Sequence, residues 1–397
     1  MNHKNYDADV IIIGGGPIGL ASAYECAKQG KSVILLERFS IGNQNGSSAG
    51  HVRMWRIMYT EIEHARLAIK AGELYKELEA DIGEKILYKN GLLNFGVETD
   101  YTPEGTLETA IDVMDQLGKK YTRLNKNQIE RRYPFQNLPD NFHGVWQEDG
   151  ATIDVKKVIE GLHNLNITYG VDIMCDQHVK KIKSEANGVE VITNDNTYTA
   201  KKVIVASGAY INEIVKTSFN FEFNILIWEM CFAYYKITDP TVKFPMFFQF
   251  DDPHNGYSNL FYGFPEVDFG RKGFVRLAVD WASCTFTDIN EREFTPRRLD
   301  IALTRDYAIK YMRGVDSCPI DMASALMAHF PDNHSLLDFA PKKYVENNQN
   351  VILCAGGWAF KFAPLFGKVC AELAIHGKTS FNIDEFTINR KGLINEK

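Results

Sequence analysis

A run of glycines directly after a short apolar segment restricts the fold of this chain more than any other feature. Residues 9–13 (DVIII) are expected to form a strand, and Gly14-Gly15-Gly16-Pro17-Ile18-Gly19 follows at once. The glycines match G-x-G-x-x-G, and the segment from Pro17 to about Gln29 is typical of a helix. A second apolar strand, Val33–Glu37, ends 18 residues after Gly19. This order predicts a Rossmann-like dinucleotide-binding unit.

Each part of this motif has a physical role in holding a dinucleotide. Gly14 permits a tight turn, Gly16 lets the backbone approach a pyrophosphate, and Gly19 allows the helix to pack closely on the strand. The helix N-terminus attracts the phosphates. The Glu37 carboxylate would accept hydrogen bonds from ribose hydroxyls and repel a 2′-phosphate, so the motif disfavours NADP.

Two distant segments favour FAD over NAD. Residues 203–209 (VIVASGA) are typical of a buried strand that ends in small residues. Residues 355–361 (AGGWAFK) predict a further glycine turn before a helix, which runs from about Pro364 to His376. Close approaches at several distant points suit an elongated cofactor, and FAD is longer than NAD.

The remaining segments predict two interleaved domains. Residues 1–90, 146–225 and 321–397 have α/β patterns and are assigned to an FAD-binding domain. Residues 91–145 and 226–320 contain alternating, aromatic-rich runs such as MCFAYYKI and GFVRLAVDW, which predict an antiparallel sheet and are assigned to a substrate domain. The expected fold class is therefore α/β, or α+β overall, with a Rossmann-like FAD-binding domain interleaved with an antiparallel-sheet substrate domain.

Composition excludes several classes of function. Lys and Arg number 44 against 51 Asp and Glu, so the net charge of −7 offers no footprint for nucleic acid or an anionic membrane. No window approaches the about 18 apolar residues of a membrane span. The first residues, MNHKNYDADV, contain no apolar h-region or small-residue cleavage site, so no signal peptide is expected. The seven cysteines are scattered without a CxxC pair, which predicts free thiols in the cytoplasm, with neither a metal site nor a disulfide framework.

Five segments together resemble a known family. They are DVIIIGGGPIGLASAYECAKQGKSVILLER, NGSSAGHVRMWRIMY, TYTAKKVIVASGAY, YGFP and AGGWAFKFAPLFG. The chain resembles the D-amino-acid-oxidase-like flavoproteins, in particular the branch of monomeric sarcosine oxidase and N-methyltryptophan oxidase, with local resemblance to the nikkomycin-pathway imino-acid oxidase. The expected cofactor-binding residues are Gly14, Gly16, Pro17, Ile18, Gly19, Glu37, Arg38, Ser47, Ser48, Arg53, Val179, Ser207, Gly208, Gly356, Gly357, Phe360 and Lys361.

The resemblance also implies a substrate site. Arg56 and Lys361 match the family pair that grips the substrate carboxylate, for which a guanidinium fork and an ammonium are well suited. Arg53 is expected against the flavin or the cation pair. Tyr262 matches a tyrosine that lines the substrate cavity. From the residues alone, two surface arginines and a core tyrosine remain the alternatives.

This chain departs from the sarcosine oxidase pattern where the flavin is attached. The family uses a cysteine six residues before a proline, and here Ala325 stands in that place before Pro331. Cys318 lies seven residues earlier. FAD is therefore expected to bind non-covalently, with attachment through Cys318 as the alternative. Met327 replaces a family tyrosine and makes that wall of the cavity apolar.

Further departures concern oxygen and the amine. Arg276 aligns with the family lysine that promotes reaction with oxygen, although Lys272 is an alternative and either residue can instead be a solvated strand residue. Asp280 replaces a family histidine and is expected, together with Glu98, to accept a substrate proton. The alternatives are a strand-end salt bridge for Asp280 and a solvated loop position for Glu98. Trp358 replaces a second histidine and is expected as an aromatic wall, with core packing as the alternative.

The resemblance implies an FAD-dependent oxidation of the C–N bond of an amino acid, with a secondary or cyclic amine as the favoured substrate. Sarcosine-, proline- or pipecolate-like compounds fit this description. Hydride would pass to flavin N5, and O₂ would reoxidise the flavin to give H₂O₂. The expected form is a monomer whose partners are an amino-acid substrate and O₂. The alternatives are a dehydrogenase with a non-oxygen acceptor and a non-catalytic flavin-binding relative.

Overall fold

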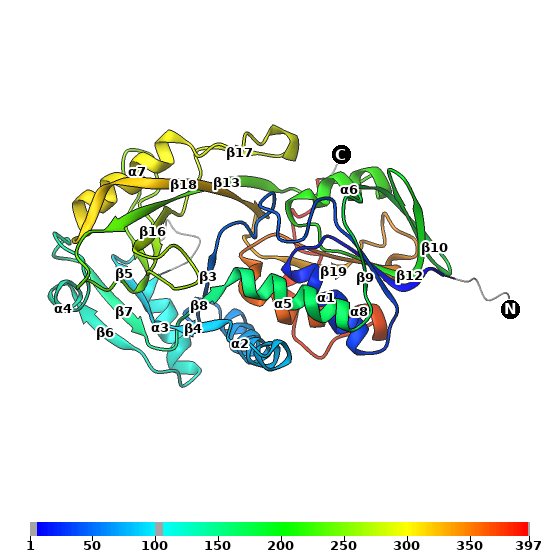
Figure 1. The fold of residues 1–397 in the computed structure, drawn as a ribbon, viewed down its shortest axis with the longest axis horizontal. Coiled ribbons are helices and arrows are strands. Elements are labelled where there is room, and N and C mark those ends of the chain that lie inside the picture. Colours follow the sequence, from blue (N-terminus) through cyan, green and yellow to red (C-terminus); the bar gives the residue numbers. More distant parts are fainter. Residues whose placement is uncertain (1–5, 100–105, 396–397) are drawn as a thin grey trace.

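The computed structural model describes residues 6–99 and 106–395. They form two lobes that share long strands (Figure 1). One lobe is built on an eight-stranded sheet and the other on a nine-stranded sheet, with a three-stranded sheet between them. The mixed α/β architecture expected from the sequence is confirmed.

The eight-stranded sheet carries the glycine motif. Its path is β10-β11-β12-β1-β2-β9, and β20 pairs with both β12 and β19. Strands β12, β1, β2, β9 and β20 are parallel, whereas β10 and β11 form an antiparallel extension. The strands are β1 (Ala8–Ile13), β2 (Val33–Leu36), β9 (Asp172–Met174), β10 (Val179–Glu185), β11 (Gly188–Thr193), β12 (Thr197–Val205), β19 (Leu336–Phe339) and β20 (Val351–Ala355).

Both faces of this sheet are covered, which explains why its strands are apolar without alternation. Val10 and Ile12 of β1 pack into one core with α1, α8, α5 and α2, whereas Ile11 and Ile13 pack into a second core with α6 and the end of β18. The helices of the chain are α1 (Pro17–Lys28), α2 (Ile62–Ile82), α3 (Leu107–Gln116), α4 (Lys126–Arg132), α5 (Val155–Thr168), α6 (Ile211–Phe219), α7 (Arg298–Tyr311) and α8 (Ala363–His376).

The nine-stranded sheet follows the path β17-β13-β16-β15-β14-β5-β7-β6, and β18 also pairs with β13. All its pairs are antiparallel except β5 with β14, which are parallel. Helices α4 and α7 cover one face. The strands are β5 (Leu92–Gly96), β6 (Thr122–Asn125), β7 (His143–Gln147), β13 (Leu226–Ile237), β14 (Met246–Phe250), β15 (Phe261–Phe264), β16 (Phe274–Val279), β17 (Thr285–Phe286) and β18 (Val315–His329).

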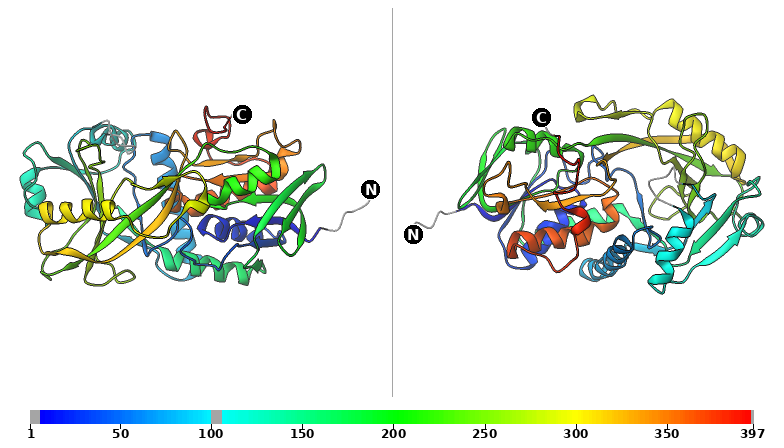
Figure 2. Two further views of the ribbon diagram at one scale, coloured as in Figure 1. Left: turned by 90° about the horizontal axis from the view of Figure 1, so that it is seen from above. Right: turned by 180° about the vertical axis from the view of Figure 1, so that it is seen from behind.

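The two lobes are joined by continuous elements as well as by connecting loops. Strand β18 pairs with β13 along its length and ends beside the eight-stranded sheet, as the views in Figure 2 also show. The small sheet of β3 (Val52–Trp55), β4 (Leu87–Lys89) and β8 (Ala151–Asp154) lies between the lobes. The domain boundary expected at 320/321 falls inside β18, and that at 145/146 inside β7, so the division into domains stays a prediction.

Two expectations from composition can be compared with the structure. All seven cysteines are free thiols, as expected. Among the described residues, none of the helices combines the length and apolarity needed to cross a membrane.

Candidate functional site

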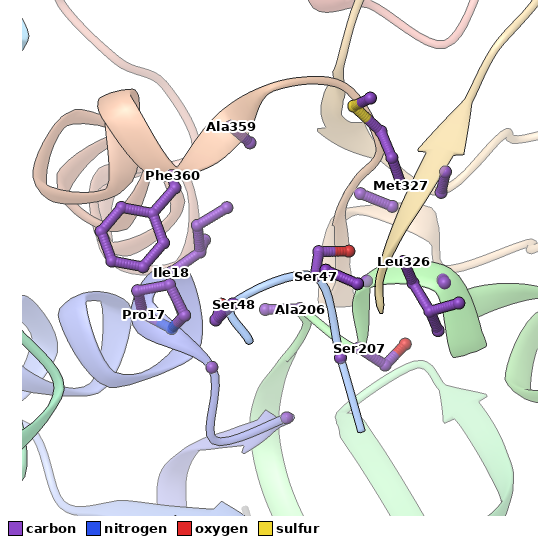
Figure 3. Close-up of a pocket in the computed structure, with 18 of the residues that line it drawn as sticks. Pro17, Ile18, Ser47, Ser48, Ala206, Ser207, Leu326, Met327, Ala359 and Phe360 are labelled. Atoms are coloured by element: carbon purple, nitrogen blue, oxygen red, sulfur yellow. The ribbon is translucent and has the colours of Figure 1, made fainter. Parts of the chain in front are cut away.

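A long cavity of about 300 Å³ runs between the glycine motif and the nine-stranded sheet. Four separate segments supply much of its wall: the first turn of α1, the loop of residues 42–48, the end of β12, and the turn that follows β20. Figure 3 shows side chains of these segments around one shared space, with Met327 of β18 on the far side. The structure thus brings together the segments that the sequence assigned to the cofactor.

Glycine suits the three motif positions for different geometric reasons. Gly14 has φ +108°, and a Cβ there would lie 2.5 Å from the Ala206 carbonyl oxygen. A Cβ on Gly19 would lie 1.9 Å from the Gly14 oxygen, so only glycine lets α1 pack this closely on the turn. Gly16 is the N-cap of α1, and a Cβ there would meet nothing within 4 Å. This open side leaves room for a phosphate at the helix N-terminus.

Glu37 lies directly behind the glycine turn. It is buried, and its carboxylate accepts hydrogen bonds from the backbone N–H groups of Gly15 at 2.5 Å and Phe39 at 2.8 Å. Arg38 forms a 2.7 Å ion pair with Glu213, and both side chains line the same end of the cavity. Sequence reasoning did not find Glu213, because it approaches from α6.

Arg53 holds the backbone of the loop beside the cavity. Its guanidinium donates to the carbonyl oxygens of Ser47, Ala49 and Val52 at 2.6, 2.6 and 2.8 Å. Ser47 and Ser48 line the cavity (Figure 3). Burial and the nearby Arg276 lower the pKa of Arg53 to about 10. Arg53 therefore shapes the cofactor side of the site.

Two further turns approach the cavity where small residues were expected. Gly208 has φ +56°, and the buried Ser207 hydroxyl beside it has no hydrogen-bond partner among the described residues. After β20, Gly356 and Gly357 have φ +76° and +67°, and a Cβ on either would lie 2.5 Å from another side chain. Val179, Trp358, Phe360 and Lys361 also line the cavity. A bound dinucleotide would supply a hydrogen-bond partner for the Ser207 hydroxyl, and Gly208, where a Cβ would meet nothing within 4 Å, leaves room for it.

Arg56 and Lys361 come together around one aromatic ring. Arg56 follows β3, and Lys361 lies in the short 3₁₀ turn η4 (Ala359–Phe362). The Arg56 guanidinium carbon lies 4.7 Å, and the Lys361 Nζ 5.5 Å, from the centre of the Tyr59 ring. Both cations are buried, and burial lowers the pKa of Lys361. The Tyr75 hydroxyl donates to the Phe360 carbonyl oxygen at 2.7 Å and so holds this turn.

The nine-stranded sheet presents one face to the cavity. Phe248, Tyr262 and Ala278 are paired across neighbouring strands, so their side chains share this face. Arg276 and Asp280 lie two residues before and after Ala278 and therefore point the same way. The register places an arginine, a tyrosine and a carboxylate on the wall opposite the glycine motif.

Asp280 is the acidic group of this wall. Its side chain is buried, and its Oδ2 has no hydrogen-bond partner among the described residues. Burial raises the pKa of Asp280 to about 6, against the opposing effect of Arg56 and Lys361. A buried carboxyl with such a pKa can exchange a proton near neutral pH.

Arg276 is a buried cation against aromatic rings. Its guanidinium carbon lies 3.8 Å from the centre of the Phe232 ring and 5.1 Å from that of Phe264. Lys272, the alternative from the sequence, is exposed in the turn before β16. Glu98 is also exposed and lies 3.0 Å from His143, so the expected help from Glu98 at the substrate site is wrong.

Several residues near the cations were not found from the sequence. Tyr59 is the ring that both Arg56 and Lys361 approach, and Lys361, Arg56 and His64 lower the pKa of Tyr59 although burial alone would raise it. His64 binds Glu385 at 2.8 Å and Glu61 at 3.1 Å. The sequence feature that could have pointed to Tyr59 is its position three residues after Arg56.

Comparison with known proteins identifies the family. A model of the FAD dependent oxidoreductase family matches residues 9–373. This chain belongs to that family. It is a flavoprotein oxidoreductase, and the cavity, the open face of Gly16 and the unpartnered Ser207 hydroxyl fit FAD.

The relatives confirm the resemblance stated from the motifs. A putative bifunctional amine oxidase of Dictyostelium discoideum is 40% identical over 97% of this chain, which spans 37% of that longer protein. Monomeric sarcosine oxidase of Bacillus sp. (strain B-0618) is 28% identical, with 97% of this chain and 96% of that protein covered. The structure of NikD, described as an unusual amino acid oxidase essential for nikkomycin biosynthesis, matches this flavoprotein with a TM-score of 0.90 and 31% identity over 96% of this chain and 97% of NikD.

Proposed function

We propose that this flavoprotein oxidises the C–N bond of an amino acid with a free carboxylate. The favoured substrate is a secondary or cyclic amine, such as a sarcosine-, proline- or pipecolate-like compound. The observation that carries the proposal is the burial of Lys361 and Asp280 on the wall of the cavity. Arg56 is not among the lining residues, but it is buried near enough to both to affect their pKa values. Two cations and one acid match the carboxylate and the amine of such a substrate.

The cations would bind and orient the substrate. A carboxylate held by Arg56 and Lys361 loses its rotational freedom, and this places the α-carbon for reaction. Desolvation strengthens the interaction, because both cations are removed from water. Tyr262, Phe248 and Trp358 would enclose the apolar part of the substrate, which favours a ring or an N-alkyl group over a charged side chain.

Asp280 would remove the amine proton. Its carboxylate form accepts a proton from the substrate ammonium, and the neutral amine can then release the α-hydrogen as hydride while the C=N bond forms. FAD, when bound, supplies the acceptor for this hydride. Loss of hydride from the neutral amine leaves a protonated imine, which water hydrolyses to a carbonyl compound and an amine. Further desaturation would need a second equivalent of oxidised flavin.

We propose O₂ as the final electron acceptor, with H₂O₂ as product. The support is the buried Arg276 guanidinium on the cavity wall, because a fixed positive charge stabilises developing superoxide. A dehydrogenase with another acceptor is the second candidate. It is favoured by arginine in place of the family lysine, because arginine cannot donate a proton near neutral pH.

We also propose that FAD is held without a covalent bond and that the flavoprotein acts as a monomer. Ala325 lines the cavity, whereas Cys318 is exposed seven residues earlier on β18, about 23 Å away along an extended strand. Cys354 does line the cavity, but its interaction with Cys370 and its burial raise its pKa, so its thiol stays protonated. The monomer is suggested by the relatives named monomeric sarcosine oxidase.

The test is an anaerobic titration. Purified protein is first precipitated with acid, and yellow colour in the supernatant shows that FAD is released. Intact protein is then mixed with a panel of amino acids without oxygen while the flavin spectrum is recorded. Bleaching by a cyclic or N-alkyl amino acid is expected. If none of these compounds bleaches the flavin, the proposed chemistry is wrong.

Admission of air completes the experiment. Rapid return of the oxidised spectrum, with one H₂O₂ formed per flavin, is the expected result. If the flavin stays reduced in air and is reoxidised by an artificial dye, the protein is a dehydrogenase.

A further inference from the structure

A buried ion pair lies outside the proposed reaction site. Glu229 of β13 and Arg292, which follows the short 3₁₀ turn η2 (Ile289–Glu291), approach to 3.3 Å, with side chains 0% and 3% exposed. The Ser324 hydroxyl of β18 donates to the same Glu229 oxygen at 2.8 Å. Burying two charges costs free energy that their attraction offsets only in part, so the pair by itself is weak evidence for stability.

The other end of Arg292 reaches the loop of the cofactor cavity. Its Nη1 donates to the Asn45 carbonyl oxygen at 2.7 Å. The Tyr210 hydroxyl donates to the same oxygen at 3.1 Å. Asn45 lies within the segment 42–48 whose neighbours Ser47 and Ser48 line the cavity (Figure 3). Arg292 therefore connects the nine-stranded sheet to the cofactor loop.

The chain around Arg292 is shaped to keep it in place. Phe294 has φ +59°, a left-handed conformation that is unfavourable for a residue with a side chain. Its ring is largely exposed, and the Arg292 guanidinium carbon lies 4.1 Å from its centre. A strained backbone and an exposed aromatic ring are both explained if Phe294 covers the guanidinium.

We propose that Arg292, held by Glu229 and Ser324, is a staple that keeps residues 43–50, which include most of the cavity-lining loop 42–48, in place beside bound FAD. The proposal rests on the binding of FAD in this cavity, and its readout by Kd applies to non-covalently bound FAD. Ser324 is next to Ala325, which lines the cavity, so the anchor of Glu229 lies at the part of β18 that borders the cofactor side. Arg53 holds the same loop from within, and Arg292 holds it from the other lobe.

The variants are chosen to distinguish loss of the contact with the loop from a general loss of stability. Arg292→Met alone would leave Glu229 buried without its partner and endanger folding. The Arg292→Met/Glu229→Gln double variant removes both charges at nearly constant shape. Arg292→Lys keeps the charge but lacks the fork that reaches Glu229 and Asn45 together. Arg298→Met is the matched control, because Arg298 is exposed on the first turn of α7.

Two readouts are made on the purified holoprotein. The first is the Kd for FAD and its release rate, from flavin fluorescence after reconstitution and dilution. Loss of a charged hydrogen bond predicts a Kd about 10 to 100 times higher for the double variant and for Arg292→Lys, and an unchanged Kd for Arg298→Met. The second is hydrogen exchange in peptides that cover residues 43–50, which is expected to rise in the same two variants.

The outcomes decide the proposal whatever the reaction is. If either variant folds and keeps both the wild-type Kd and wild-type exchange in residues 43–50, the staple does not exist. If acid shows that FAD is covalently attached, exchange alone decides, and an unchanged loop overturns the proposal. Failure to oxidise any amino acid would contradict the proposed function and leave the staple standing, because neither readout requires turnover.

Discussion

The guanidinium carbon of Arg56 lies 4.7 Å from the centre of the Tyr59 ring, and Tyr59 in turn lies beside Lys361. Phe248 packs on the same guanidinium at 5.1 Å. These rings restrict the rotamers of Arg56, so its orientation is set before a carboxylate arrives. A fixed fork loses less conformational entropy on binding than a mobile side chain.

Arg56→Lys should lower kcat/KM for an amino acid about 10- to 100-fold, because an ammonium cannot bind a carboxylate through two parallel hydrogen bonds. Steady-state kinetics check this, together with the Kd of an unreactive carboxylic acid measured from the flavin spectrum. Arg66→Lys is the control, since Arg66 is exposed on α2 and pairs with Glu63. An unchanged kcat/KM would remove Arg56 from the substrate site.

Asp280 should control the acid limb of the pH profile. Because burial raises its pKa to about 6, Asp280 is protonated below that pH and cannot accept the amine proton. We expect kcat/KM to rise with pH through about 6 in the wild type. In Asp280→Asn, the rise of kcat/KM with pH through about 6 should disappear, and kcat/KM should fall about 100-fold or more. Glu98→Gln, at the exposed acid, should retain both, and a limb that survives in Asp280→Asn would point to another base.

Arg276 should affect the reaction with oxygen more than the reduction of the flavin. Arg276→Met removes the buried positive charge and is expected to slow reoxidation by O₂ about 100-fold. Arg276→Lys keeps the charge and should slow it much less. Stopped-flow measurements of the two half-reactions separate the effects. Equal slowing of both half-reactions in Arg276→Met would indicate a general disturbance of the cavity instead.

Alanine substitutions at Gly19 and Gly16 should affect different properties, the first the stability of the apoprotein and the second its affinity for FAD. A Cβ on Gly19 would overlap the Gly14 oxygen, so Gly19→Ala should lower the free energy of unfolding of the apoprotein by several kcal/mol, about the cost of a severe packing clash. A Cβ on Gly16 meets open space, so Gly16→Ala should leave the stability of the apoprotein unchanged and weaken FAD binding. Urea unfolding and FAD titration distinguish the two. Wild-type affinity in Gly16→Ala would place the phosphates elsewhere.

His64 should stabilise the fold at low pH and lose this effect in mild alkali. Against desolvation, which lowers it, hydrogen bonds to Glu385 and Glu61 raise the pKa of His64 to about 9. The folded pKa lies above the value of about 6.5 in the unfolded chain, so the stabilisation is complete below pH 6.5 and disappears as pH rises through 9.

The measurement is the difference in free energy of unfolding between wild type and His64→Gln. We expect this difference to shrink by up to about 3 kcal/mol between pH 6 and pH 10. Other groups titrate in both proteins and cancel in the difference. A difference independent of pH would show that His64 is neutral in the folded protein.

Local patterns made the first unit of the fold predictable. The strand expected at residues 9–13 and the helix expected from Pro17 appear as β1 and α1 within one residue, because an apolar run and glycines act on neighbouring residues. The same holds for the strand expected at Val33–Glu37, which appears as β2 and ends one residue earlier. The 21-residue helix α2 was assigned to no element, and the parallel pairing of β5 with β14 has no local signal.

The sequence by itself determined the glycine turn, the acid behind it and the cation types of the site, because each is a property of a short segment. Only the tertiary structure decided which charged residues meet. Arg56 and Lys361 are 305 positions apart, and both approach the ring of Tyr59. Strand register turned Arg276 and Asp280 to the cavity, whereas Glu98 lies in the exposed segment after β5 and meets His143 there. Register and lobe contacts depend on packing across the whole chain, and a local pattern carries no information about them.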